Sequence, residues 1–557
     1  MTISDNGRKV LTLILCSVLL FLLGNQVVSL SNPDEVFYAG TAKEMAQQHT
    51  WTVPYLFSQP QFEKPILTYW LIRAAFLVFG TTPFAARFFP AFFALLGVLG
   101  VYFLCARVYG DRKRAFWCAF VLMSGVLYIG LARTVFTDMI FSIFTGLSLG
   151  AFYLGYHDRK WRPAGLVLFF VFSGLAVLTK GLLGLTIPLG AVLLFLYLRR
   201  ELGYLWCRST VLGVILLTAI AVPWYVLMIA KFGRAFIDEL WVNDHVRRLA
   251  EAEHAHNDKW YFYPGAVLLC FFPWTIWTAA SFGHLVSRLK EKSASPFAWF
   301  LACWIAAGFL QVQVAHSKLV SYIFPIFPAV AIITGDFLRE TLIVEAECFA
   351  FLPRGYAGKA RGFALTTLVV FLLLPPAAVV AAYRYPSYVG RPDLACIVMG
   401  VFLAIVLVQI WLVKKNVRLF PYAAAFNLAF LFFAVLTFAP YVDDMVASRG
   451  AGEYVRQEQP AADSVLCSKM IVRGVRYYSD KEVGVLKLGG GAFFSAHPIP
   501  FIDSNEELLG YLKARPRTIA VLEKKDLAAV RAALDGRYEC VLLKQFGGQS
   551  VVKFVGK

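Results

Sequence analysis

Charged residues are scarce in this sequence: Asp, Glu, Lys and Arg together make up 16% of its 557 residues. A soluble globular protein carries about a quarter charged residues and is close to half apolar. This chain is instead 59% hydrophobic and 16% aromatic. The composition therefore excludes an ordinary soluble protein and indicates an integral membrane protein.

Several sequence signals are missing as well. Gly489-Gly490-Gly491 is not followed by the Gly-Lys-Ser/Thr of a phosphate-binding loop, so no nucleotide cofactor is expected. The chain has no repeat of fixed period and no low-complexity linker. No small-x-small cleavage site separates the first hydrophobic run, 10–30, from Asp34, so we interpret that run as an uncleaved membrane span.

Long hydrophobic runs dominate the first 440 residues. A membrane-spanning helix needs about 20 mostly apolar residues. The shorter run 66–79 is predicted to be a helix that lies along the membrane surface. Thirteen runs are predicted to span, at 10–30, 84–106, 115–132, 138–156, 164–180, 182–198, 210–230, 262–283, 296–315, 319–338, 362–382, 393–413 and 420–440.

Basic residues cluster between alternate spans. If these clusters face the cytoplasm, the N-terminus lies inside, and the loop with Asp34 and the C-terminal tail lie outside. This distribution explains the net charge of +18 without a nucleic-acid partner. The clusters are Arg8-Lys9, Arg112-Lys113-Arg114, Arg159-Lys160, Arg199-Arg200, Arg288 with Lys290 and Lys292, Lys359 with Arg361, and Lys414-Lys415.

Three outward regions exceed the length of a turn: the loops 31–83 and 231–263 and the tail 441–557. The chain is thus predicted to be a polytopic α-helical membrane protein, with a catalytic membrane domain at 1–440 and a small α/β domain at 441–557. Whether Cys467 and Cys540 in that tail form a disulfide is left open by the sequence. Predicted strands of the tail are 464–470, 518–522, 539–544 and 551–555, and predicted helices are 505–514 and 525–534.

The adjacent acids Asp34 and Glu35 follow the first span closely. Carboxylates so near a bilayer are costly unless function retains them, so they form an active-site hypothesis. An ionised carboxylate there can take a proton from an attacking hydroxyl. The structural alternative is a cap for a helix that begins near Val36, but one acid would suffice for a cap.

Several cations lie on the same outer side. Lys64 precedes the aromatic pair Tyr69-Trp70 and can neutralise a lipid phosphate as a compact point charge. Lys180 interrupts an apolar stretch, and Lys318 precedes Tyr322 by one helical turn. Singly each is equally well an interfacial anchor. Together they predict an anion site at the outer leaflet.

Histidines gather in the second outward loop. His245 with Glu63 offers imidazole and carboxylate, which suit zinc. The spacing matches no compact metal motif, so on spacing alone solvated loop histidines are the favoured interpretation.

These motifs, in this order, resemble the lipid-carrier-dependent glycosyltransferases of the membrane-embedded C-type fold. The resemblance is strongest to the bacterial group of lipid A aminoarabinose transferases and protein mannosyltransferase-like enzymes. The motifs that carry it are Pro33-Asp34-Glu35 with Tyr38-Ala39, Phe62-Glu63-Lys64-Pro65 with Tyr69-Trp70, Ala86-Arg87 before Pro90, Thr179-Lys180-Gly181, His245 with Arg248 before Pro273-Trp274, and Ser317-Lys318 with Tyr322 and Pro325.

The resemblance implies an inverting sugar transfer from a polyprenyl phosphate to lipid A, or to another envelope glycan or protein, at the periplasmic face of the bacterial inner membrane. Its catalytic carboxylates would be Asp34 and Glu35, with no nucleic-acid partner and a monomeric enzyme. Glu63 and His245 match positions that bind a divalent ion, zinc or magnesium, in relatives. Donor phosphate-binding residues would be Lys64, Lys180, Arg248, Lys318 and Tyr322.

Two positions depart from the aminoarabinose pattern. Phe37 stands where an arginine is expected, and Leu182 where proline is common. The motifs therefore indicate the reaction class and do not identify the sugar. A protein O-glycosyltransferase is the alternative enzyme, and a secondary transporter is the alternative class. The transporter is disfavoured because the sequence shows no internal repeat and its charges gather at one interface.

Overall fold

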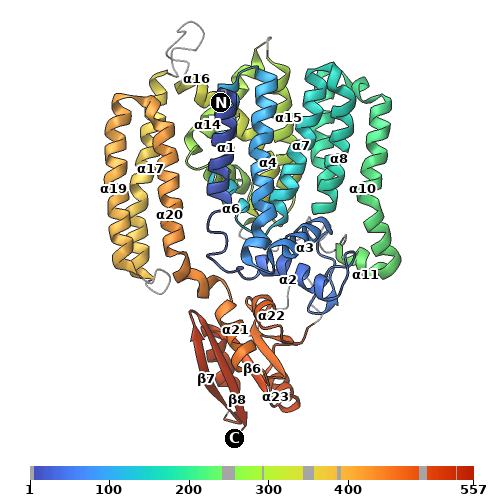
Figure 1. The fold of residues 1–557 in the computed structure, drawn as a ribbon, viewed down its shortest axis with the longest axis vertical. Helices are drawn as coiled ribbons and strands as arrows, with labels where there is room; N and C mark the ends of the chain where they lie inside the picture. The colour runs from blue at the N-terminus through green and yellow to red at the C-terminus, as the bar shows by residue number, and fades with distance from the viewer. Residues whose placement is uncertain are drawn as a thin grey trace.

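The computed structural model describes residues 5–240, 242, 257–291, 294–342, 357–385, 391–488, 499–534 and 536–556. A bundle of long apolar helices stands above a small mixed α/β domain, and the N-terminus and that domain lie at opposite ends of the molecule (Figure 1). Nine helical segments in the described part of the chain are long and apolar enough to cross a membrane. They contain α4 (Pro83–Tyr109), α7 (Thr137–His157), α8 (Arg162–Lys180), α10 (Arg208–Phe232), α15 (Pro296–Gln313), α16 (Phe327–Leu342) with the preceding turn η5 (Val320–Ile326), α17 (Ala357–Arg384), α19 (Pro392–Lys415) and α20 (Phe420–Val446).

Two further spans are broken. The break between α5 (Arg112–Met123) and α6 (Val126–Ala132) bends the chain by 67°. The break between α13 (Phe262–Cys270) and α14 (Thr275–Lys290) bends it by 118°, at Pro273, which cannot donate a helical hydrogen bond.

The count of spans differs from the predicted thirteen. With each bent pair taken as one span it reaches 11 among the described residues. The remaining two predicted runs form α1 (Asp5–Phe21) and α9 (Leu183–Arg199), helices of 17 residues each. They are shorter than the roughly 20 residues that a straight span requires. The fold class, a polytopic helical membrane protein with a small α/β tail, is confirmed.

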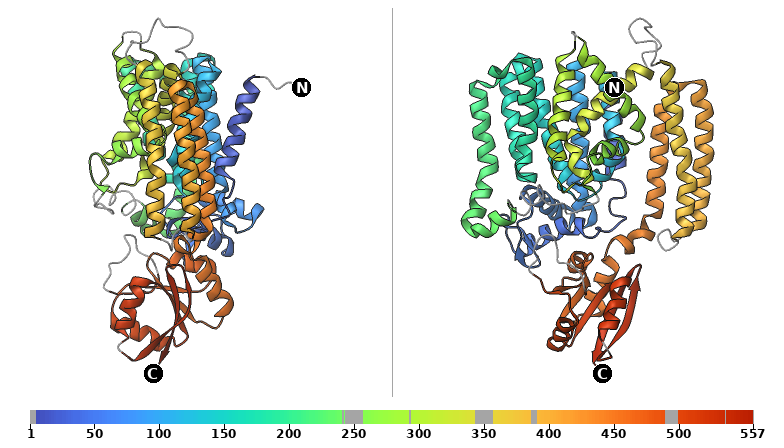
Figure 2. Two further views of the ribbon diagram at one scale, coloured as in Figure 1. Left: turned by 90° about the vertical axis from the view of Figure 1, so that its left-hand side faces the viewer. Right: turned by 180° about the vertical axis from the view of Figure 1, so that it is seen from behind.

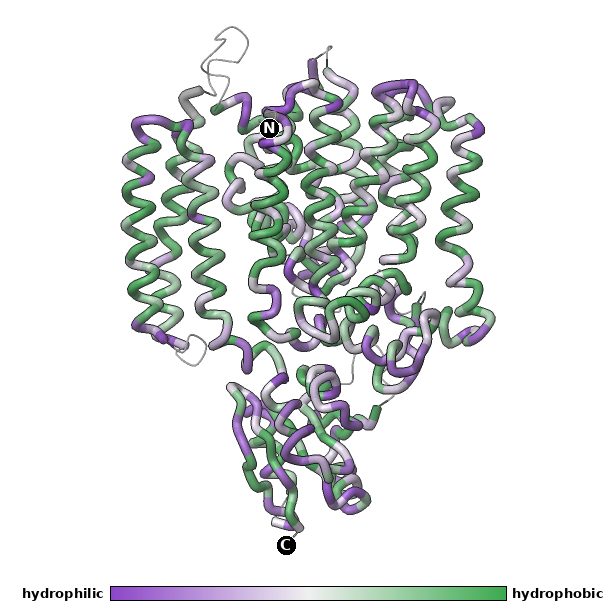
Figure 3. Tube along the Cα trace, in the orientation of Figure 1, coloured by the Kyte–Doolittle hydropathy of each residue, from purple (hydrophilic) through white to green (hydrophobic). Residues whose placement is uncertain are grey.

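Hydrophobic residues cover the helices, and polar residues gather at the two ends of the bundle (Figure 3). The interior is filled by large aromatic side chains such as Trp274, Trp277 and Trp304, each at most 1% exposed. At the end opposite the α/β domain, Arg339 pairs with Asp111 at 2.6 Å. The helices α17, α19 and α20 form a separate group at one side of the bundle (Figures 1 and 2).

A layer of short elements closes the bundle on the side of the α/β domain (Figure 1). The run predicted at 66–79 forms the helix α3 in this layer, beside α2. Acidic residues occupy the first turn of α2, where the helix dipole favours negative charge. The layer consists of α2 (Asp34–Gln47), β1 (Tyr55–Leu56), β2 (Gln59–Pro60) and α3 (Leu67–Phe79), and the helix α11 (Arg234–Ile237) lies nearby.

The C-terminal domain is built on a six-stranded sheet of order β5-β4-β3-β6-β8-β7. Strands β3 to β6 run parallel, and β8 and β7 join antiparallel. Alternate residues of the strands face α22 on one side and α23 and α24 on the other. Its elements are α21 (Arg449–Glu458), β3 (Ser464–Ser468), α22 (Val472–Ser479), β4 (Val483–Leu486), β5 (Phe501–Ile502), α23 (Asn505–Ala514), β6 (Thr518–Glu523), α24 (Lys524–Ala533), β7 (Tyr538–Phe546) and β8 (Gln549–Gly556).

The two tail cysteines are too far apart to form a disulfide. Cys467 lies on β3 and Cys540 on β7, with β6 and β8 between them. Three inter-strand spacings amount to about 14 Å, far beyond the Cα separation of a disulfide. Both thiols are free.

Candidate active site

The two neighbouring acids lie in opposite environments. Asp34 is the first residue of α2 and its side chain is exposed. Glu35, the next residue, is only 2% exposed and points into the protein. Asp34 is therefore the carboxylate that a substrate can reach.

Glu35 is held by a buried ion pair with Arg87 of α4. The guanidinium donates from Nε to Oε1 at 2.7 Å and from Nη2 to Oε2 at 2.6 Å. The backbone N–H of Val135 donates to Oε1 at 3.0 Å, and Ser31 donates to Oε2 from its backbone N–H at 3.0 Å and its hydroxyl at 2.9 Å. Five hydrogen bonds saturate this carboxylate. Its contacts favour a positioning role over direct catalysis.

Arg87 also fixes the loop that leads to Asp34. Its remaining N–H groups donate to the carbonyls of Asn25 at 2.8 Å, Val28 at 2.6 Å and Ser29 at 2.9 Å. All five guanidinium donors are thus used within a buried site. The sequence showed Arg87 only as part of a motif, although a charged residue within a span is itself a signal of function.

Residues from the far end of the chain secure the same loop. Ser29 donates to Asp443 at the end of α20, from its backbone N–H at 2.6 Å and its hydroxyl at 2.8 Å. The backbone N–H of Leu30 donates to the hydroxyl of Tyr478 at 2.9 Å. Asn32 donates to Ser448 at 2.8 Å. The loop before Asp34 is therefore clamped between α4, α20 and the C-terminal domain.

Lys180 and Tyr322 form a second part of the site. The ammonium of Lys180 donates to Asp138 at 2.5 Å and lies 4.4 Å from the centre of the Tyr322 ring. Both members of the ion pair are mostly buried. The structure thus brings together two of the predicted phosphate-binding residues, Lys180 and Tyr322.

Tyr38 connects this cluster to Asp34. Burial raises the pKa of its hydroxyl well above the ordinary value, and the neighbouring Tyr69 together with the negative charges of Asp138 and Asp34 raises it further. Tyr38 therefore remains a neutral hydroxyl, and both carboxylates lie within electrostatic range of it. In the sequence, Tyr38 belongs to a motif that indicates no role for it.

Lys318 belongs to a third cluster on the same side. Its buried ammonium donates to Asp258 at 2.6 Å, and His316 Nδ1 lies 2.7 Å from the other oxygen of that carboxylate. Hydrogen bonds from His316 and Lys318 lower the pKa of Asp258 to about 2. Asn257 donates to the backbone carbonyl of Lys318 at 3.1 Å. The sequence gave no signal for Asp258, which is one acid in a polar loop.

Lys64 and Glu63 lie half-buried in the segment between β2 and α3. Phe62 anchors this segment against Phe232 of α10 at a ring distance of 5.0 Å. The side chain of Gln61 donates to the Tyr69 hydroxyl of α3 at 2.7 Å. The segment that carries Lys64 therefore bridges α3 and α10.

Two predicted site residues, His245 and Arg248, lie outside the described part of the chain. No group of three or more His, Cys, Asp or Glu residues able to hold a metal ion occurs among the residues with described positions. Glu63 is thus the one described member of the predicted metal pair. The metal site stays a prediction.

The arrangement suits an anionic leaving group. Lys180 and Lys318 are each held by a carboxylate before any ligand arrives, so their positive charges are preorganised. Asp34 is an accessible carboxylate on the same end of the bundle. The two ammonium groups can stabilise a leaving phosphate, and the carboxylate of Asp34 can accept the proton of an attacking hydroxyl.

Comparison with known proteins adds to this geometry. Residues 7–237 match the family model of dolichyl-phosphate-mannose-protein mannosyltransferases. An undecaprenyl phosphate-alpha-4-amino-4-deoxy-L-arabinose arabinosyl transferase of Enterobacter sp. (strain 638) is 28% identical over 461 residues, which cover 82% of this chain and 80% of the relative. One from Yersinia pestis (strain Pestoides F) is 28% identical over 343 residues, 61% of this chain and 60% of that protein.

The crystal structure of ArnT from Cupriavidus metallidurans bound to undecaprenyl phosphate shares the fold. It matches with a TM-score of 0.79 at 20% identity and covers 99% of this chain and 98% of that chain. The fold is therefore that of the membrane-embedded C-type glycosyltransferases, as the motifs indicated. Within that class, the chain is similar over most of its length to aminoarabinose transferases.

Proposed function

We propose that the protein transfers 4-amino-4-deoxy-L-arabinose from undecaprenyl phosphate to lipid A, at the periplasmic face of the bacterial inner membrane. The observation that carries the proposal is the exposed carboxylate of Asp34 on the same end of the bundle as the held ammonium groups of Lys180 and Lys318. The similarity to aminoarabinose transferases over 82% of the chain supports the sugar and the carrier.

The proposed reaction is an inverting displacement. An acceptor oxygen forms a bond to the anomeric carbon, the bond from that carbon to the phosphate oxygen breaks, and undecaprenyl phosphate leaves with the bonding electron pair. Asp34 takes the proton of an acceptor hydroxyl, or holds the nucleophile in place where it is already ionised. General base catalysis of this kind contributes about 10²–10⁴-fold.

The leaving phosphate gains negative charge, which preplaced cations stabilise. Lys64, Lys180, Arg248 and Lys318 supply that charge, and the Tyr322 hydroxyl donates a hydrogen bond to the phosphate. Asp138 and Asp258 hold two of the ammonium groups until the donor arrives. Little reorganisation is then needed at the moment of bond breaking.

A protein O-glycosyltransferase is the second candidate. The family model matched at residues 7–237 favours it, because its description names protein mannosyltransferases. The two functions share the acid and the lipid donor and differ in the acceptor. Mass spectrometry of lipid A and of envelope proteins, from cells with and without the gene, separates them.

Replacing Asp34 tests the role of the carboxylate. Asp34→Asn keeps the shape of the side chain and removes its charge, so transfer should fall by about 10²-fold or more. Binding of undecaprenyl phosphate should stay within about twofold, since the cations are intact. Purified protein reconstituted with the donor and lipid A gives both measurements.

Asp463→Asn is the matched control, because Asp463 is an exposed acid that pairs with Arg517 in the C-terminal domain. Its transfer rate should equal that of the unmodified protein. Normal turnover by Asp34→Asn would reject the catalytic assignment. A loss of transfer in both variants would show that the effect of Asp34→Asn is not specific to that residue.

A further inference from the structure

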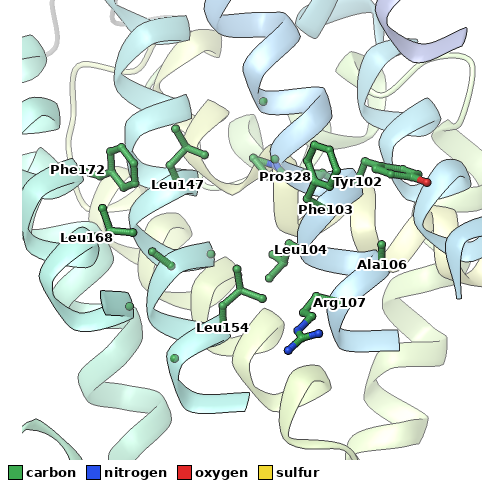
Figure 4. Close-up of a pocket in the computed structure, with 18 of the residues that line it drawn as sticks. Tyr102, Phe103, Leu104, Ala106, Arg107, Leu147, Leu154, Leu168, Phe172 and Pro328 are labelled. Carbon is green, nitrogen blue, oxygen red and sulfur yellow. The ribbon is translucent and has the colours of Figure 1, made fainter. Parts of the chain in front are cut away.

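A large cavity lies between α4, α7 and α8, and the proposed reaction does not use it. Its volume is about 910 Å³, and its walls are mainly aliphatic and aromatic. Figure 4 shows Leu147, Leu154 and Leu168 around this space, with Leu104 on the α4 wall and Arg107 at its edge. A volume of this size is typical of a site for a small molecule or lipid chain.

The cavity occupies the half of the bundle away from Asp34. Along α7 its lining runs from Ile143 to Gly155. At 1.5 Å per residue this stretch is roughly 18 Å long, and it begins roughly 7.5 Å beyond Asp138. The far end lies near the last residue of α7, His157, at the membrane surface opposite the candidate active site.

Several glycines line the cavity. Gly100 on the α4 wall and Gly146 and Gly150 on the α7 wall present no side chains to it. A Cβ atom at Gly146 or Gly150 would meet only ordinary contacts, at 3.5 and 3.8 Å, so close helix packing does not require glycine at either position. The absence of side chains at Gly146 and Gly150 therefore leaves room for the cavity.

The far end of the cavity is positively charged. Arg107 and Arg112 are the only charged residues among the described residues that line it. The Arg107 side chain is 59% exposed and pairs with Asp158 at 2.9 Å, while Arg112 is exposed at the start of α5. Trp161, also in the lining, is 53% exposed, as befits a residue at the membrane–water interface.

We propose that this cavity binds an anionic phospholipid of the leaflet opposite Asp34. One acyl chain fills the apolar space, and the phosphate lies against Arg107 and Arg112. Charge complementarity selects this occupant, since basic residues at a membrane surface attract anionic lipids. A polyprenyl tail entering from the side of Asp34 would place no phosphate against Arg107 and Arg112, which lie at the far end of the cavity. The inference is independent of the proposed reaction.

Photo-crosslinking tests the proposal. The full-length protein is placed in phosphatidylcholine nanodiscs that contain a trace of phosphatidylglycerol, phosphatidylcholine or polyprenyl phosphate, each with a diazirine on its chain, and the labelled peptides are mapped. Phosphatidylglycerol should label 97–107, 143–155 and 161–172 about fivefold more than phosphatidylcholine does, because even one basic residue at the surface gives a preference of that order.

Two variants locate the site. Arg107→Gln/Arg112→Gln should reduce labelling by phosphatidylglycerol to the phosphatidylcholine level, and Ala151→Phe, which fills the cavity, should reduce labelling by every lipid. Arg159→Gln/Lys160→Gln removes two charges from the same surface outside the cavity lining and should change labelling less than twofold. Size-exclusion profiles and melting temperatures check that each variant is folded.

Three results would overturn the proposal. Equal labelling by phosphatidylglycerol and phosphatidylcholine would show ordinary bilayer contact. Labelling by polyprenyl phosphate alone would identify the carrier as the occupant. Labelling unchanged by Ala151→Phe would place the lipid elsewhere. Should the double arginine variant fail to fold, Arg112→Gln alone, at an exposed residue, carries the same expectation at a smaller magnitude.

Discussion

At the scale of single residues, the neighbours Asp34 and Glu35 lie in different environments. Successive residues at the start of a helix point about 100° apart, so one can face solvent while the next faces the core. Asp34 is exposed, and Glu35 is locked to Arg87 beneath it. The exposed acid is accessible, and its neighbour is held in a buried ion pair.

The buried pair makes a quantitative prediction. Glu35→Gln or Arg87→Met leaves one buried charge without its partner, which costs roughly 3–5 kcal/mol of unfolding free energy. The double variant should lose less than the sum of the two, because neither charge remains. Thermal unfolding in detergent, followed by tryptophan fluorescence, measures all three, and strictly additive losses would contradict the role of the pair.

Asp258 predicts a pH dependence. Its pKa is about 2 in the folded protein against an ordinary value of 3.8, because His316 and Lys318 donate hydrogen bonds to its ionised form. A carboxyl whose pKa is lowered by folding stabilises the protein fully above about pH 4 and loses that contribution as the pH falls toward 2. Lys318 is released over the same range.

The difference in melting temperature between the unmodified protein and Asp258→Asn measures this contribution. It should be constant from pH 7 down to about pH 4 and should vanish near pH 2. A difference that grows as the pH falls would contradict the assigned direction. Arg517→Ala, in an exposed ion pair of the C-terminal domain, is the control and should shift the melting temperature little at any pH.

At the scale of elements, two ion pairs join α2 to α22 and to Asp480, the residue that follows α22. Lys43 contacts Asp480 at 2.7 Å, and Arg476 contacts the buried carboxylate of Glu44 at 3.1 Å. Arg476 also donates to the hydroxyl of Ser58 at 2.9 Å. The helix that begins with Asp34 is therefore oriented by the C-terminal domain.

Arg476→Ala should slow transfer several-fold and lower the unfolding free energy by about 1–3 kcal/mol, because Glu44 then stays buried with one partner fewer. The effect should fall on turnover more than on carrier binding, since Lys180 and Lys318 are held by Asp138 and Asp258, which lie outside α22. Transfer assays and binding titrations of the reconstituted protein separate the two. Unchanged turnover would show that α22 does not position the acid.

Elements with strong local signals were predicted well. The helix predicted at 505–514 coincides with α23, where the Ser504 hydroxyl accepts the N–H of Glu507 and caps the first turn. The strand β4 was missed, because its four residues are all buried and show no alternation. The helix α22 was also missed, since its first turn lacks a side-chain cap.

The residues of the candidate site were likewise predicted only in part. The sequence predicted Asp34, Lys180 and Lys318 as charges at one face, because charge beside a span stands out. It could not show that Lys180 pairs with Asp138, 42 residues away, or that Glu35 pairs with Arg87 at a separation of 52. Such pairings depend on how helices pack, which spacing along the chain does not encode.

At the scale of the whole molecule, the helix ends that carry the basic clusters and the C-terminal domain lie at opposite ends (Figures 1 and 3). The positive-inside rule then predicts that the C-terminal domain lies outside. Alkaline phosphatase fused after Lys557 should be active in cells, and a green fluorescent protein fusion there should be dark. The reverse pattern would place Asp34 on the cytoplasmic side.

The hydrogen bonds that hold the loop before Asp34 can form only late in synthesis of the chain. Ser29 and Leu30 leave the ribosome early, whereas their partners Asp443 and Tyr478 are translated more than 400 residues later. A nascent chain can thus insert its helices in turn while the loop before Asp34 still lacks these contacts. A chain truncated before Asp443 should therefore lack both of these contacts to the loop that precedes Asp34.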